Sequence, residues 1–273
     1  MTNLIRSEWI KFRSVRSTVV TLLLAGVIVV LVAVLAGRNA DQPADDRCVP
    51  TSFDQESSGA PATTDGPCPE GFEVVSDQVP VRLTDLTGGV SFAVLLFGVL
   101  GVQVIGQEYR FNTIRPTFTA APDRFKVLVA KTIVVSVACA VVSVVMLAFC
   151  WLAGTAIVDA FATDGVDVRV AWGIVLFSSL WAAAGVAVGA IVRQPIAGIL
   201  VLLGWSLVLE SLIGGLIDGA YQWMPFTNGF QMTFRIGEDS PELRGILEGG
   251  IYFAAVAAVL WGLGAYLVNK RDA

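Results

Sequence analysis

The sequence predicts an all-α integral membrane protein with six transmembrane helices, and three observations support this. Hydrophobic residues make up 55% of the chain and charged residues 15%, whereas soluble domains carry about 25% charged residues. The apolar residues gather in runs long enough to cross a ~30 Å hydrocarbon core as helices. The cations concentrate in short segments that separate some of these runs. The chain has no His, which removes the commonest general base and metal ligand.

The six apolar runs are residues 17–37, 88–106, 127–161, 170–192, 196–217 and 251–268. The first ends near Val34-Leu35-Ala36, which resembles a signal-peptide cleavage site, but signal cores are typically about 7–15 residues. We therefore expect an uncleaved spanning helix. The third run corresponds to ~50 Å of continuous helix, so it must tilt, project into water or break, and Gly154 is a plausible break.

Smaller features indicate how these runs end and pack. Gly185 and Gly189 have GxxxG spacing, which allows close approach of another helix without specifying which one. Pro195 follows a very tight turn and suits the first position of the next helix. Lys131 lies at one end of the third run, where its long side chain is expected to reach the headgroups. Cys139 and Cys150 lie inside that run and are interpreted as small apolar residues.

The segment 1–16 carries four cations and one acid. On a helix, Ile5, Trp9 and Phe12 share one face, with Arg6 and Arg13 at its edge. This pattern is typical of a helix lying on the inner membrane surface. A plain positively charged flank explains the composition equally well.

Two segments are too polar or too interrupted to be spans. Residues 38–86 contain ten acids against three Arg, with Cys48 and Cys68 among many Pro and Gly. In an oxidising exterior these cysteines would form a disulfide closing a hairpin-like loop, and the alternative is two free thiols. Residues 218–248 mix aromatics with Pro and Gly, which predicts short re-entrant helices dipping into the outer leaflet.

Glu210 is the one candidate intramembrane polar site, because it lies within the fifth run. An ionisable side chain there indicates a proton or substrate role, a buried polar contact, or a position close to the interface. We favour the interfacial position.

The distribution of cations predicts the topology. An even number of spans places both termini on one side, and that side carries twelve of the eighteen Lys and Arg residues. The other six lie in much longer segments. The positive-inside rule therefore predicts cytoplasmic N- and C-termini and an extracytoplasmic loop at 38–86. The basic residues are those expected of membrane flanks, so they give no support to nucleic-acid binding.

Residues 107–126, QEYRFNTIRPTFTAAPDRFK, form a short basic loop between the second and third runs. The chain has no phosphate-binding loop, GxGxxG, HExxH, GxSxG or zinc-type cysteine motif. The order of segments and this loop resemble the permease (transmembrane) subunit of a bacterial type-2 ABC exporter, the ABC-2 transporter family. Asn112 stands where that family usually has Gly. The residues that carry the resemblance are Glu108, Tyr109, Arg110, Thr113, Ile114, Arg115, Pro122, Arg124, Ala130 and Lys131.

The resemblance implies that two permease chains, identical or homologous, pair and that two separate ATPase subunits dock on the cytoplasmic side. ATP and magnesium would bind those subunits, and this chain would have no cofactor or catalytic activity. The loop 107–126 would be the coupling helix. Arg110, Arg115 and Arg124 would then meet acidic groups of the ATPase, while Phe111, Ile114 and Phe118 would fill a groove. The alternative is an ordinary basic loop that only sets topology.

We therefore expect a multi-pass protein of the bacterial plasma membrane that contacts lipid and exports an amphiphilic, lipid, peptide or drug-like molecule with a partner's ATP hydrolysis. One alternative is a non-transporting membrane anchor or sensor that binds a partner through the loop at 38–86. Another is an ion-coupled carrier that works through Glu210.

Overall fold

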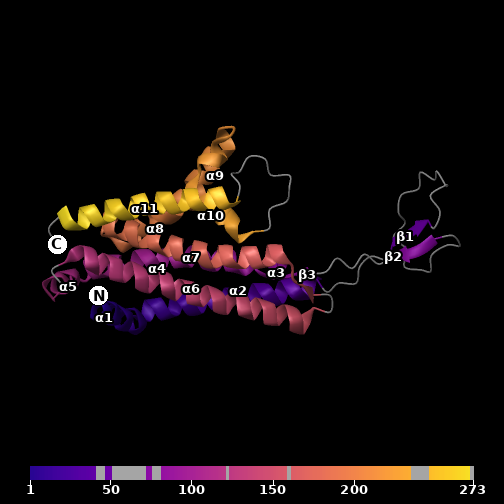
Figure 1. Ribbon diagram of the computed structural model, residues 1–273, viewed down its shortest axis with the longest axis horizontal. Coiled ribbons are helices and arrows are strands. Elements are labelled where there is room, and N and C mark those ends of the chain that lie inside the picture. The colour runs from indigo at the N-terminus through magenta and orange to yellow at the C-terminus, as the bar shows by residue number, and fades with distance from the viewer. Residues whose placement is uncertain are drawn as a thin grey trace.

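The computed structural model describes residues 1–40, 47–50, 72–75, 81–120, 123–158, 161–234 and 246–270. Within these ranges six helical segments are long and apolar enough to cross a membrane, which confirms the predicted number of spans and a multi-pass, all-α architecture (Figure 1). The segments are α2 (Arg16–Ala40), α4 (Gly88–Arg110), α6 (Arg124–Ile157), α7 (Gly165–Val192), α8 (Pro195–Leu203) continued by α9 (Glu210–Leu216), and α11 (Ile246–Lys270).

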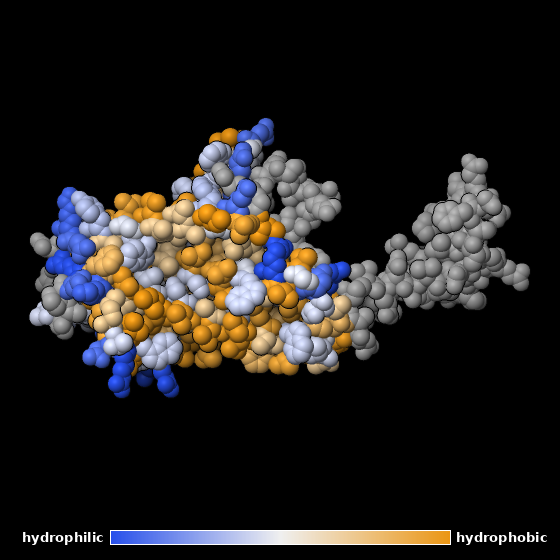
Figure 2. All heavy atoms as spheres, viewed as in Figure 1, coloured by the Kyte–Doolittle hydropathy of each residue, from blue (hydrophilic) through white to orange (hydrophobic). Residues whose placement is uncertain are grey.

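The helices form an elongated bundle with one markedly polar end. Two further helices, α1 (Thr2–Ser14) and α5 (Ile114–Ala120), lie at that end together with the last turns of α11 (Figure 1). Figure 2 shows a broad apolar band along the bundle and hydrophilic residues gathered at this end. Many exposed side chains of α2 and α6 are Val, Leu or Phe. Such a surface fits hydrocarbon better than water.

The centre of the bundle is the close contact between α4 and α7. A Cβ atom at Gly185 would overlap the carbonyl oxygen of Gly98, and one at Gly101 would overlap that of Ala182. At Gly189 an added Cβ would lie 2.6 Å from Cγ2 of Ile105. The predicted close approach at Gly185 and Gly189 is therefore confirmed, and the neighbour is a helix of the same chain.

The helix α6 runs without a break, so of the three alternatives for this long run the break at Gly154 does not occur. Its 34 residues correspond to ~51 Å of helix. Gly154 lies inside the helix, and a Cβ there would overlap the ring of Phe161. The glycine thus provides room for an aromatic ring. At the other end, the Asp123 carboxylate accepts a hydrogen bond from the Lys126 N–H at 3.1 Å, which caps the helix.

The turn between α7 and α8 matches the prediction. Arg193 ends α7 in a left-handed conformation with φ of 60°, and Pro195 occupies the first turn of α8. The fifth span is not a uniform α-helix, because a π-helical segment, Gly204–Leu209, separates α8 from α9. In Figure 1, α9 points away from the rest of the bundle.

Short helices connect the fifth and sixth spans. They are a 3₁₀ turn (Ala220–Trp223), α10 (Pro225–Phe230) and a second 3₁₀ turn (Gln231–Thr233). The ring of Phe226 lies 4.7 Å from that of Trp181 and 5.7 Å from that of Phe177, measured between centroids. These aromatic contacts hold the connecting segment against α7.

The remaining elements are short. Strands β1 (Arg47–Pro50) and β2 (Phe72–Val75) pair antiparallel, with Cys48 opposite Val74. Cys68 lies outside the described residues, so the Cys48–Cys68 disulfide stays a prediction. Strands β3 (Val81–Arg82) and β4 (Phe161–Ala162) pair in parallel, and α3 (Leu83–Leu86) follows β3.

Candidate functional site

The basic loop at the polar end contains the short helix α5, which follows a tight turn at the end of α4. Helix α4 ends at Arg110, α5 begins at Ile114, and α6 begins at Arg124. Asn112 lies in the first turn with φ of 55°. This left-handed conformation is costly for most residues, but Asn adopts it more readily than others except Gly. The Asn at this position therefore serves the same backbone requirement as a Gly.

Replacing Asn112 by Val should destabilise this turn by about 1–2 kcal/mol, because a β-branched residue is poorly tolerated at positive φ. Replacing it by Gly should leave the free energy of unfolding within about 1 kcal/mol of the wild type. Denaturant titration of both variants checks the prediction. Equal losses for Val and Gly would show that the left-handed turn is not required.

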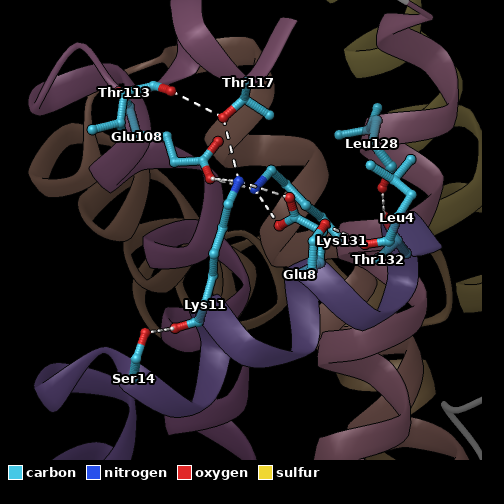
Figure 3. Close-up of polar contacts among 11 residues, drawn as sticks. Leu4, Glu8, Lys11, Ser14, Glu108, Thr113, Thr117, Leu128, Lys131 and Thr132 are labelled. Carbon is cyan, nitrogen blue, oxygen red and sulfur yellow. Dashed lines mark hydrogen bonds and ion pairs between the residues drawn. The ribbon is translucent and has the colours of Figure 1, made fainter. Parts of the chain in front are cut away.

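A group of four charged residues, three of them largely buried, connects the loop to the N-terminal helix (Figure 3). We call Glu8, Lys11, Glu108 and Lys131 the charged cluster. Lys131 Nζ lies 2.6 Å from Glu8 Oε2 and 2.6 Å from Glu108 Oε1. The side chains of Lys131 and Glu8 are only 1% and 3% exposed. Lys131 therefore does not reach the headgroups as predicted but forms ion pairs inside the protein.

Lys11 extends the cluster to α5. Its Nζ lies 2.9 Å from Glu8 Oε1 and 3.3 Å from Glu108 Oε1. It also donates a hydrogen bond to Thr117 Oγ1 at 3.3 Å. The cluster thus joins α1, α4, α5 and α6 at one point. Two carboxylates and two ammonium groups balance in charge, as buried ionic groups require.

The charges of Glu8 and Lys11 are mutually stabilised. Burial by itself would raise the pKa of the Glu8 carboxyl, but Lys131 and Lys11 outweigh burial and hold this pKa below its usual value. Burial by itself would lower the pKa of Lys11, but Glu8 and Glu108 outweigh it and the pKa is raised. Both groups therefore stay charged over a wider pH range than in water.

These shifts predict a pH dependence of stability. Glu8 contributes fully above its ordinary pKa of 4.5, and this contribution is lost as the pH falls through its lowered value in the folded protein. Lys11 contributes fully below its ordinary pKa of 10.5, and its contribution is lost as the pH rises through its raised value. Thermal unfolding across pH should show a plateau between these limits. In the Glu8→Gln variant the unfolding temperature should fall less steeply at acid pH than in the wild type. An unchanged fall at acid pH would contradict the role of the Glu8 charge.

The other predicted coupling residues near the end of α4 have distinct environments. Tyr109 is half-buried, with the Arg193 guanidinium carbon 5.0 Å from its ring centre. Arg110 is exposed. The Thr113 N–H donates to the Glu108 carbonyl oxygen at 3.0 Å, which closes the turn.

The predicted coupling residues farther along the loop are Arg115, Pro122 and Arg124. The Arg124 guanidinium donates to the Val268 carbonyl oxygen at 3.1 Å and lies 5.2 Å from the ring centre of Phe118. It is therefore engaged with α11. Arg115 lies within α5, and Pro122 lies outside the described residues.

Two of the three apolar side chains that the resemblance assigns to a partner's groove pack within this chain, and their role at a partner stays a prediction. Ile114 is 3% exposed, and Phe118 packs against the core. Phe111 is 66% exposed. Phe111 is thus the mostly exposed aromatic of this set, and the Arg110 guanidinium carbon lies 5.6 Å from its ring centre.

The sequence reasoning missed Glu8. The helix expected at 1–16 is present as α1, but Glu8 and Phe12 face inward while Trp9 is 46% exposed. One signal was available, because Glu8 is the only acid in a strongly basic segment. An isolated acid in such a segment indicates a specific ion-pair partner.

Glu210 is fully buried and makes a buried polar contact, one of the alternatives expected for it, and the interfacial depth that we favoured stays a prediction. Its carboxylate accepts hydrogen bonds from the N–H groups of Phe226 and Thr227 at 2.9 and 2.7 Å. It also accepts from the Thr227 hydroxyl and from Trp205 Nε1, both at 2.9 Å. The two backbone donors belong to the first turn of α10, so the carboxylate caps that helix. This capping role accounts for the burial of Glu210.

Replacing Glu210 by Leu should cost roughly 3 kcal/mol or more, because it leaves several buried donors without an acceptor. Replacing it by Gln should cost less, because the amide oxygen still accepts. The free energies of unfolding of both variants check this prediction. A Leu variant as stable as the wild type would contradict the structural role.

Comparison with models of known protein families gives no match, and comparison with curated protein sequences gives none either. Among the residues that the structure describes, no group of three or more Cys, Asp or Glu side chains is placed to hold a metal ion.

Proposed function

We propose that this chain is the transmembrane permease subunit of an ATP-driven exporter, with ATP hydrolysis on two separate cassette ATPase subunits. In this proposal ATP and magnesium bind the ATPase subunits, and a second permease chain completes the transporter. The substrate is an amphiphilic, lipid, peptide or drug-like molecule. The membrane is the bacterial plasma membrane, and both termini are cytoplasmic.

The observation that carries the proposal is the attachment of α5 to two spans. Helix α5 lies between α4 and α6, and the charged cluster fixes both spans to α1. A partner that pushes on α5 would therefore move α4 and α6 as a unit, as the rigid-body coupling of a transporter to its motor requires. An ordinary topology-setting loop needs no buried ion pairs.

Two other features support the same topology. The six spans place α1, α5 and the end of α11 at one end of the bundle (Figure 1). The excess of Lys and Arg at this end favours the cytoplasm. The segment 218–248, with α10 held by the buried Glu210, then lies at the outer leaflet as a re-entrant element. A disulfide between Cys48 and Cys68 is part of the same proposal.

Purification in mild detergent tests this function. We expect a cassette ATPase to co-purify and its ATPase activity to depend on this chain. Phe111→Ser should lower the amount of bound ATPase about tenfold, because truncating an aromatic that acts as a hot spot of an interface costs more than about 1 kcal/mol. Tyr266→Ser is a matched control, since Tyr266 is 57% exposed near the same end of the bundle on α11.

Two results would contradict the proposal. One is an active, complete protein with no ATPase bound. The other is capture of an envelope enzyme or kinase through residues 38–86, which would favour a membrane anchor or sensor.

A further inference from the structure

A cavity of about 290 Å³ lies between α7, α10, α11 and the irregular fifth span. Four aromatic side chains line it, namely Trp181, Trp205, Phe226 and Phe253. The ring centres of Trp181 and Phe226 lie 4.7 Å apart, and those of Trp181 and Phe253 lie 6.3 Å apart. These three rings are buried, whereas Trp205 is 45% exposed. The cavity therefore has a floor of packed rings and an outer rim at Trp205.

The π-helical segment of the fifth span places Trp205 in the wall of this cavity. The Glu210 N–H donates to the Trp205 carbonyl oxygen, five residues earlier instead of the four of an α-helix. In a regular α-helix, side chains five residues apart point about 140° apart. Here the two side chains meet, and Trp205 Nε1 donates to Glu210 Oε1 at 2.9 Å. Single π turns within helices are frequent at functional sites.

The polar atoms at the cavity wall are already engaged within the chain. Glu210 Oε1 accepts hydrogen bonds from Trp205 and Phe226, and Oε2 accepts two from Thr227. These four donors fill the lone-pair sites of a carboxylate. The Trp181 indole nitrogen lies against α4, which contributes no described residue to the lining. The other described lining residues are aromatic or aliphatic, so a charged ligand would be buried without a partner.

The depth and the size of the cavity favour a free molecule over the acyl chain of a lipid. On α11 the lining runs from Phe253 to Leu260, so at least ~10 Å of that helix lies on each side. A lipid headgroup at the interface would therefore bring only the end of an acyl chain into the cavity. Aromatic rings make edge-to-face and offset-stacked contacts that an acyl chain lacks. Because an apolar cavity of roughly 150 Å³ holds one benzene ring, this cavity has room for about two.

We propose that this cavity binds an uncharged aromatic molecule of about two fused rings, which enters from the bilayer past Trp205. The buried rings of Trp181, Phe226 and Phe253 contact the bound molecule, and Trp205 lies at the mouth. The proposal does not depend on the exporter function, because all of the lining residues belong to one chain.

Binding of tritiated naphthalene to the purified full chain in detergent, measured by scintillation proximity, tests this site. Naphthalene has two fused rings and no charge, and the unlabelled compound should displace the label. Decane, which has the same number of carbon atoms, should compete about tenfold more weakly, which is the effect of one or two aromatic contacts. The charged analogue naphthoate should not compete, because its carboxylate would be buried without a partner.

Three results would overturn the proposal. The first is the absence of saturable naphthalene binding. The second is equal competition by decane, which would show a site for any hydrocarbon, including an acyl chain. The third is equal competition by naphthoate, which would show that the cavity accepts a charge.

A Val201→Trp variant tests the location of the site. Val201 lines the cavity and is 54% exposed, so a larger ring there obstructs the mouth without disturbing the buried core. We expect this variant to bind naphthalene at least tenfold more weakly than the wild type. Val259→Trp is the matched control, because Val259 is 64% exposed on α11 and does not line the cavity. This control should bind as the wild type does, and equal binding by the two variants would contradict the location.

Discussion

Replacing Lys131 by Met should lower the free energy of unfolding by roughly 3–5 kcal/mol, the typical cost of removing one partner of a buried ion pair. The lysine is 1% exposed and contacts both acids of the charged cluster at 2.6 Å. Without Lys131, the two negative charges of Glu8 and Glu108 are balanced by Lys11 alone. Denaturant titration in detergent measures the loss.

Lys126→Met is the matched control on the same helix. Lys126 pairs with Asp123 at 2.8 Å, but the two side chains are 58% and 46% exposed. Exposed pairs contribute about 0–1 kcal/mol. Removing Lys126 should therefore have a small effect. If both Met variants lost the same free energy of unfolding, burial would not explain the contribution of the charged cluster to stability.

Replacing Gly101 by Ala should have a comparably large effect, of about 3 kcal/mol or more. The added methyl group would overlap the Ala182 carbonyl oxygen and lie within 3.0 Å of the Gly185 Cα. Both obstacles are backbone atoms, so α4 and α7 must move apart and lose their close contact along the bundle. The measurement is the free energy of unfolding, with the monodisperse yield as a second readout.

Gly262→Ala provides the control for helix propensity. An added Cβ at Gly262 meets nothing within 4 Å, so Ala should be neutral or stabilising by up to about 1 kcal/mol. A Gly101→Ala variant as stable as Gly262→Ala would contradict the close packing of α4 against α7.

The spans were predictable from the sequence because their signal is physical and local. A run of about twenty apolar residues has few alternatives to a membrane helix. Pro195 and the Gly185–Gly189 spacing were predictable for similar reasons. Gly154 was not, because whether a glycine breaks a helix or admits a ring depends on a partner. Here the partner is Phe161, which lies in β4 after the helix has ended.

The charged cluster was only half predictable. Glu108 belongs to the loop that the sequence singled out, but Glu8 and Lys131 lie 123 residues apart. Local rules for a lysine at the end of a span favour the headgroups. The tertiary contact with two acids reverses that preference. The contacts of Glu210 were hidden for a similar reason, since three of its four hydrogen bonds come from Phe226 and Thr227, 16–17 residues later.

The most direct test of the docking role of α5 is site-specific photocrosslinking in native membranes. A photoreactive side chain at Phe111, which is 66% exposed beside α5, should crosslink to a cassette ATPase. The same side chain at Trp172, which is 65% exposed on α7, should crosslink to lipid only. An ATPase crosslink from Trp172 and none from Phe111 would contradict the account.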